Sequence, residues 1–87
     1  MAETTDNTIW IDVRTAEEYT AGFYKDSINI PYDIIHEKIA AITEEKSADI
    51  RVYCRTGRRS GVAKDILNKM GYSNVVNEGG YEDLRKR

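Results

Sequence analysis

The sequence contains few of the residues that build disulfides and metal sites, with one cysteine and one histidine among 87 residues. A single cysteine excludes an internal disulfide and any metal site made of several cysteines. His36 has neither a second histidine nor an evident acidic partner, so we interpret it as a surface residue. We therefore predict that the chain binds no metal ion and no cofactor.

The chain also lacks long apolar runs and an excess of basic charge. No stretch approaches the length of a bilayer crossing, and the net charge of −2 gives no basis for a nucleic-acid partner. Residues 1–7 are polar and acidic, carry no secretory signal as written, and are expected to form a disordered tail. We thus expect a single domain over residues 1–87 that binds neither nucleic acid nor membranes.

Apolar strands and amphipathic helices alternate along the chain, with a capping-box pattern at Thr15 and Glu18. Gly79 and Gly80 are interpreted as a turn. Alternation of this kind predicts an α/β fold, with a small parallel sheet and helices on both faces. We expect strands within 9–14, 27–30, 50–53 and 72–77. We expect helices from Thr15 to about Gly22, within 32–43, from the cysteine segment to Gly71, and within 81–87. The third helix should have a buried face that includes Val62, and the last is either a short helix or a frayed end.

Cys54 stands where an apolar strand ends and an amphipathic helix begins. A thiol at that place faces backbone N–H groups and the positive end of a helix dipole, which favour the thiolate. Gly57 permits the positive φ that such a turn requires. The turn also holds Thr56 and three basic residues, Arg55, Arg58 and Arg59. The segment is therefore a candidate nucleophile in an anion-binding loop, unless the arginines are merely solvated surface charges.

A second strand ends at Asp12 and Arg14. Ligands of parallel sheets bind beyond the carboxyl ends of the strands, so both residues are expected to face the same crevice as Cys54. We interpret Asp12 as a structural hydrogen-bond partner of nearby backbone. Arg14 either pairs with a carboxylate or lines the cleft.

Two reactions use a cysteine in an anion-binding loop: cleavage of phosphate esters and transfer of sulfur. The protein tyrosine phosphatase signature places an arginine six residues after the cysteine, whereas here that position is Ser60 and the arginine is Arg59. A loop one residue shorter fits a single extra sulfur atom better than a phosphoryl group. No aspartate-bearing loop is evident as a general acid, so sulfur transfer is preferred.

The chain resembles single-domain rhodaneses, which are thiosulfate sulfurtransferases. It departs from many members over residues 22–27, where those have Gly-His-Ile-Pro-Gly-Ala. The resemblance implies the strand order last strand, cysteine strand, Asp12 strand, Ile28 strand. It is carried by Trp10-Ile11-Asp12-Val13-Arg14, Ile28-Asn29-Ile30-Pro31, Val52-Tyr53-Cys54, Gly57, Arg59-Ser60-Gly61-Val62-Ala63, residues 64–72 and Glu78-Gly79-Gly80.

The resemblance further implies that the Cys54 thiolate takes the outer sulfur of thiosulfate, releases sulfite, and passes the sulfur from a persulfide to cyanide or a thiol. Arg55, Arg58 and Arg59 would attract the anionic donor, and Arg59 would order the loop. It also implies a monomer that is periplasmic as a mature chain, with the cytoplasm as the alternative. The competing interpretation is a non-catalytic binding or regulatory module.

Overall fold

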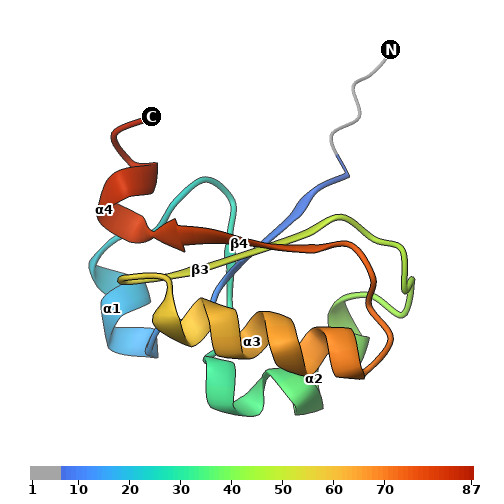
Figure 1. Ribbon diagram of the computed structural model, residues 1–87. Helices are drawn as coiled ribbons and strands as arrows, with labels where there is room; N and C mark the ends of the chain where they lie inside the picture. Colours follow the sequence, from blue (N-terminus) through green and yellow to red (C-terminus); the bar gives the residue numbers. More distant parts are fainter. Residues whose placement is uncertain (1–6) are drawn as a thin grey trace.

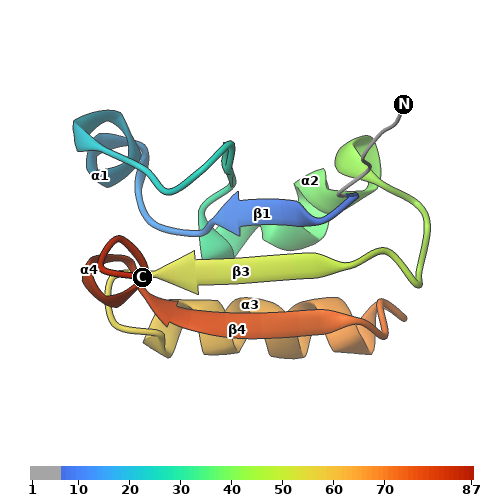
Figure 2. The same ribbon diagram turned by 90° about the horizontal axis from the view of Figure 1, so that it is seen from above.

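The computed structural model describes residues 7–87, so the predicted tail over 1–7 lies outside the described residues except for Asn7. Four parallel strands form one sheet in the order β2-β1-β3-β4 (Figures 1 and 2). The predicted parallel sheet and its strand order are confirmed. The strands are β1 (Ile9–Asp12), β2 (Ile28–Asn29), β3 (Ile50–Cys54) and β4 (Val75–Gly80).

The helices fall into two groups. The longer helices α2 and α3 lie side by side on one face of the sheet (Figure 1). The short helices α1 and α4 lie beyond the carboxyl ends of the strands (Figure 2). The helical elements are α1 (Ala16–Ala21), the 3-10 helix η1 (Tyr32–Ile34), α2 (Ile35–Ile42), α3 (Arg58–Lys69) and α4 (Tyr81–Leu84).

The core lies between the sheet and the two longer helices. Alternation along β1 points Ile9, Ile11 and Val13 toward this core and Trp10, Asp12 and Arg14 toward the opposite face. Five large aliphatic side chains in the core are fully buried, each contributing about 1.5–3 kcal/mol by leaving water. They are Ile11, Ile35, Ile39, Ile50 and Leu67.

The opposite face of the sheet is covered differently. Segment 22–27 contacts it through Tyr24, whose N–H bonds to the Tyr53 hydroxyl at 2.9 Å. Tyr81 at the start of α4 stacks on Tyr53 of β3 with ring centroids 6.3 Å apart. Tyr24 and Trp10 meet edge to face beside them, at 5.1 Å. The second side of the sheet is thus covered mainly by a loop and by aromatic rings, to which α4 contributes Tyr81.

Three local predictions differ from the structure. The expected helix over 32–43 begins as η1, because Tyr32 N–H bonds to Val13 O and Ile34 has a non-helical φ of −121°. Gly79 and Gly80 belong to β4 instead of a turn. Val62 is 43% exposed, because it faces a surface hollow instead of the core.

The predicted capping box at the start of α1 is present. Thr15 Oγ accepts a hydrogen bond from Glu18 N at 3.2 Å, and the Glu18 carboxylate accepts one from Thr15 N at 3.0 Å. Within residues 7–87, none of the helices combines the length and apolar character needed to traverse a bilayer.

Candidate active site

Cys54 is the last residue of β3, and its side chain is fully buried. Gly57 N–H donates a hydrogen bond to Sγ at 3.0 Å. Gly57 is the N-cap of α3 and has a φ of +96°, a left-handed conformation that glycine adopts readily. The loop, defined here as the cysteine loop (residues 54–59), thus turns the amino end of a twelve-residue helix toward the sulfur.

The surroundings of the sulfur favour the thiolate. Burial raises the pKa of the Cys54 thiol, but hydrogen bonds from the Ser60 hydroxyl and from the amides of Ser60, Thr56 and Gly57 outweigh it, so the pKa lies below its ordinary value. The thiolate is the nucleophilic form of cysteine. The geometry therefore equips Cys54 for attack on an electrophilic atom.

The cysteine loop and the end of β4 approach each other closely through backbone atoms. A Cβ on Gly80 would lie 2.6 Å from Arg55 O, and one on Gly57 would lie 3.3 Å from the Cα of Gly79. Between Val52 and Cys54, β4 carries one extra residue relative to β3, and Gly79 adopts a φ of +96° there. Gly79 and Gly80, which are interpreted from the sequence as a turn, therefore pack directly against the backbone of the cysteine loop.

The three arginines of the loop have different environments. Arg59 donates two hydrogen bonds to the Glu18 carboxylate, Nη1 to Oε1 at 2.9 Å and Nη2 to Oε2 at 3.1 Å. The hydrogen bond from Arg59 is the main reason that the pKa of Glu18 falls to about 2. Arg55 and Arg58 are exposed, and neither forms an ion pair with any residue from 7 to 87.

Asp12 and Arg14 form a buried pair at the end of β1. Arg14 Nη2 lies 2.7 Å from Asp12 Oδ2, and the backbone N–H of Arg14 donates to Asp12 Oδ1 at 2.9 Å. Arg14 Nη2 also donates to Gly22 O at 2.6 Å, and the guanidinium lies 4.3 Å from the Tyr81 ring centroid. Arg14 therefore pairs with a carboxylate and lines a hollow at the same time.

Two hollows open beside the cysteine loop. Of the Glu18–Arg59 ion pair, Glu18 lines the larger hollow and Arg59 lines the smaller one. The larger, of about 510 Å³, contains Arg14, Glu18 and Arg55 in its wall. The smaller, of about 400 Å³, is lined by Tyr32, Thr56, Arg58, Arg59 and Val62. Each hollow thus receives one arginine that is free to attract an anion.

Two residues at the site were not predicted from the sequence. Ser60 is fully buried, and its Oγ lies 3.5 Å from Sγ of Cys54 and 2.6 Å from Oδ1 of Asn77. The signal for Ser60 was its place in the first turn of the helix after the cysteine. Asn77 carries no such signal, because only the register of β4 brings it to the loop.

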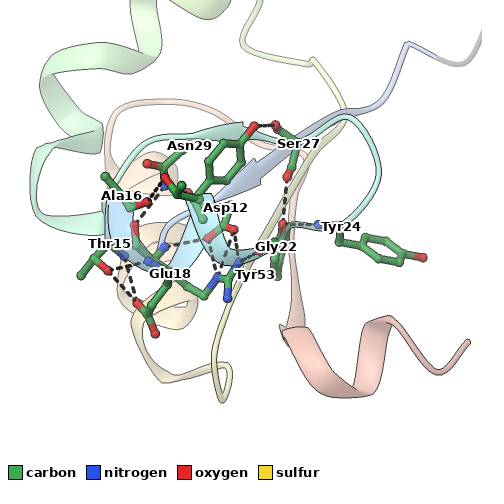
Figure 3. A network of polar contacts seen from close by, with 12 residues as sticks. Asp12, Thr15, Ala16, Glu18, Gly22, Tyr24, Ser27, Asn29 and Tyr53 are labelled. Carbon is green, nitrogen blue, oxygen red and sulfur yellow. Dashed lines mark hydrogen bonds and ion pairs between the residues drawn. The ribbon is translucent and has the colours of Figure 1, made fainter.

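Segment 22–27, where the sequence departs from the rhodanese pattern, is anchored by Tyr53 (Figure 3). The Tyr53 hydroxyl accepts the N–H of Tyr24 at 2.9 Å and shares a hydrogen bond with Ser27 Oγ at 2.8 Å. Burial is the main cause that raises the pKa of Tyr53 to about 12, so the hydroxyl keeps its proton. Tyr53 therefore holds the segment in place through two hydrogen bonds.

Neither metal ligands nor the lone histidine belong to this site. Among residues 7–87, no three histidine, cysteine, aspartate or glutamate side chains cluster in a way that could hold a metal ion. His36 is exposed on α2, where its Nε2 lies 3.5 Å from Glu37.

Known proteins resemble this chain in sequence and in fold. The family model for the rhodanese-like domain matches residues 1–87. Thiosulfate sulfurtransferase PspE of Escherichia coli K12 is 45% identical over 75 residues, which span 86% of this chain and 72% of that protein. Thiosulfate:glutathione sulfurtransferase of Saccharomyces cerevisiae is 33% identical over 80 residues, spanning 79% of this chain and 58% of that protein.

Solved structures agree in fold. A rhodanese from E. coli, solved with anions, superposes with a TM-score of 0.85 at 44% identity, covering 88% of this chain and 91% of that one. The human single-domain sulfurtransferase TSTD1 superposes with a TM-score of 0.80 at 21% identity, covering 93% and 83%, and so supports the fold alone. By sequence and by fold, the chain belongs to the rhodanese-like domain family.

Proposed function

We propose that this protein is a thiosulfate sulfurtransferase that carries sulfane sulfur from thiosulfate to cyanide or a thiol through a persulfide on Cys54. The observation that carries the proposal is the placement of the only cysteine, buried at the carboxyl end of β3 with its sulfur held by Gly57 N–H. Relatives named as thiosulfate sulfurtransferases support the choice of reaction.

The reaction consists of two sulfur transfers. The Cys54 thiolate attacks the outer sulfur of thiosulfate, the sulfur–sulfur bond of the donor breaks, and sulfite leaves with the bonding electron pair. The new persulfide carries its negative charge on the outer sulfur. Cyanide or a thiolate then attacks that outer sulfur, and Cys54 leaves again as a thiolate. This is covalent catalysis with the ping-pong kinetics of two half-reactions.

Each site residue has a distinct role in this scheme. The exposed Arg55 and Arg58 draw the dianionic donor to the loop, and the amides of Thr56 and Gly57 hold the sulfur. Arg59 keeps the loop in shape through Glu18. Asp12 and Arg14 support the same edge of the sheet as a buried pair.

Two alternatives make different predictions. A binding or regulatory module of this fold would contain Cys54 but would not release sulfite from thiosulfate. A cysteine-dependent phosphatase would hydrolyse aryl phosphates. The sequence spacing from Cys54 to Arg59, which is one residue shorter than in the phosphatase signature, disfavours that reaction. Phosphatase turnover that disappears in Cys54→Ser would reverse the assignment of the reaction class.

The proposal is tested by steady-state formation of thiocyanate from thiosulfate and cyanide. Wild type should turn over, and Cys54→Ser should lose all turnover while its melting temperature changes little, because oxygen replaces sulfur without a change of shape. Substantial turnover in Cys54→Ser would refute the role of the thiol.

We also propose that the protein acts as a monomer in the periplasm, with the cytoplasm as the alternative compartment. Only the resemblance to single-domain rhodaneses supports this. Size-exclusion chromatography coupled to light scattering tests the oligomeric state, and fractionation of the source cells tests the compartment.

A further inference from the structure

Asn77 lies outside the cysteine loop, yet its side chain contacts three parts of the site. Its Oδ1 accepts Gly79 N–H at 3.0 Å and the Ser60 hydroxyl at 2.6 Å. Its Nδ2 donates to Gly57 O at 2.9 Å, a contact that fixes which way the amide faces. Gly57 O also accepts Gly61 N–H at 3.0 Å, so the loop carbonyl stays bound without Asn77.

The Ser60 hydroxyl has one proton and two acceptors within reach. A serine hydroxyl donates once, so it cannot serve Asn77 Oδ1 and Cys54 Sγ together. While the sulfur is a neutral thiol, the amide oxygen at 2.6 Å is the better acceptor. A thiolate reverses this preference, because hydrogen bonds to charged acceptors are about twice as strong as neutral ones. Asn77 Oδ1 keeps Gly79 N–H as a donor after the change, so no acceptor is left without a partner.

We propose that Ser60 is a second catalytic residue whose hydroxyl turns between two acceptors, donating to Asn77 while Sγ is uncharged and to Sγ while Cys54 is a thiolate. Its proton stays on the oxygen throughout. In the persulfide the charge lies on the outer sulfur, so the hydroxyl faces Asn77, and it turns back as Cys54 leaves in the second transfer. Asn77 acts through Ser60 as the competing acceptor. The consequence for turnover rests on the proposed sulfur transfer.

Apart from the half-buried Tyr32, the other titratable groups near the sulfur are already paired or exposed, so they do not perform this switch. Three of the titratable groups on the elements packed around the sulfur are held in ion pairs: Arg59 on α3 by Glu18 on α1, Asp12 on β1 by Arg14, and Glu78 on β4 by Arg51 and Arg87. The others are Tyr32 on η1 and the exposed Arg55 and Arg58.

The test is the rate of iodoacetamide alkylation of Cys54 as a function of pH, which requires no sulfur transfer. Ser60→Ala should move the midpoint upward by about one pH unit, because the thiolate loses one hydrogen bond to a charged group. Asn77→Ala should move it downward, by about half a pH unit, because the thiol state loses the acceptor that competed for the proton. The double variant should match Ser60→Ala, since Asn77 has no effect without the hydroxyl.

Asn74→Ala and Ser73→Ala are the matched controls, since both residues are exposed near the amino end of β4 and contact no atom of the site. Both should leave the midpoint at the wild-type pH. In single turnover, Ser60→Ala should discharge its persulfide to cyanide about tenfold more slowly than wild type, because the leaving thiolate loses the same hydrogen bond.

Opposite shifts in the two single variants, with no additional shift in the double variant, would support the proposal. Upward shifts in both that add in the double variant would mean that Asn77 merely shapes the loop, and would overturn it. An unchanged midpoint in Asn77→Ala would overturn it as well. Asn77 is exposed, so its alanine variant tests the switch even if Ser60→Ala fails to fold. Absence of persulfide in wild type would refute sulfur transfer and leave the alkylation result intact.

Discussion

At the scale of single residues, the neighbouring arginines Arg58 and Arg59 differ in what they bind. Arg59 spans from α3 to the Glu18 carboxylate on α1 with two hydrogen bonds, while Arg58 reaches solvent. A guanidinium that holds a carboxylate at both oxygens fixes geometry as well as charge. The resemblance to single-domain rhodaneses singles out Arg59 as the arginine that orders the loop, but its partner Glu18 follows only from the position of α1.

Arg59→Lys should therefore lower sulfurtransferase kcat/KM by about tenfold, because an ammonium keeps the charge but cannot form the planar pair with Glu18. Arg58→Lys is the matched control and should lower it by less than about twofold, since only its charge matters. The measurement is thiocyanate formation at constant ionic strength. Equal kinetics for Arg59→Lys and wild type would reduce Arg59 to a surface charge.

The same pair predicts how stability depends on pH. The pKa of Glu18 is lowered from 4.5 to about 2 in the folded protein, chiefly by its hydrogen bond with Arg59. A lowered folded-state pKa gives stability that is fully present above 4.5 and disappears as the pH falls toward 2. Wild type should therefore exceed Glu18→Gln in free energy of unfolding at pH 7 and lose that advantage near pH 2. Urea denaturation at both pH values checks this, and a constant difference would contradict it.

At the scale of elements, the alternating strands and helices could be predicted from apolar periodicity and turn residues. Isoleucines at helical spacing gave α2, and the Thr15–Glu18 pattern gave α1 with its cap. The bulge in β4 could not be predicted, because it arises from the fit of its backbone against the cysteine loop. Asn77 was missed for the same reason, since its role depends on strand register and not on local sequence.

The contact between β4 and the loop yields a prediction for Gly80. Gly80→Ala would place a Cβ 2.6 Å from Arg55 O, so either the loop or the end of β4 must shift. We expect a loss of about 1–3 kcal/mol in unfolding free energy and a fall in activity of at least about tenfold. In Gly61→Ala the new Cβ meets only Asn77 Nδ2, at 3.4 Å, so this control should stay folded. Wild-type stability and activity in Gly80→Ala would contradict the close approach.

At the scale of the whole molecule, the parallel topology brings the carboxyl ends of β1 and β3 to the same edge of the sheet. β1 ends at Asp12 and β3 ends at Cys54, and α1 and α4 both lie beyond that edge (Figure 2). That β1 and β3 end at a shared edge was predictable, because parallel strands end together. Within residues 7–87, a single crevice shared by Cys54, Asp12 and Arg14 is not seen: Arg14 lines the larger hollow, while Cys54 and Asp12 are buried and line neither of the two hollows. The larger hollow and the aromatic rings on the second face were not predictable, since they depend on how segment 22–27 and α4 pack around Tyr53. The smaller hollow depends on how η1 lies beside the cysteine loop and α3.

The central claim is that Cys54 carries the transferred sulfur, and intact-mass spectrometry tests it most directly. The protein is mixed with thiosulfate, freed of excess reagent, weighed, and weighed again after cyanide is added. We predict that wild type gains the mass of one sulfur atom and loses it to cyanide, and that Cys54→Ser gains none. No gain in wild type, or the same gain in Cys54→Ser, would contradict the account.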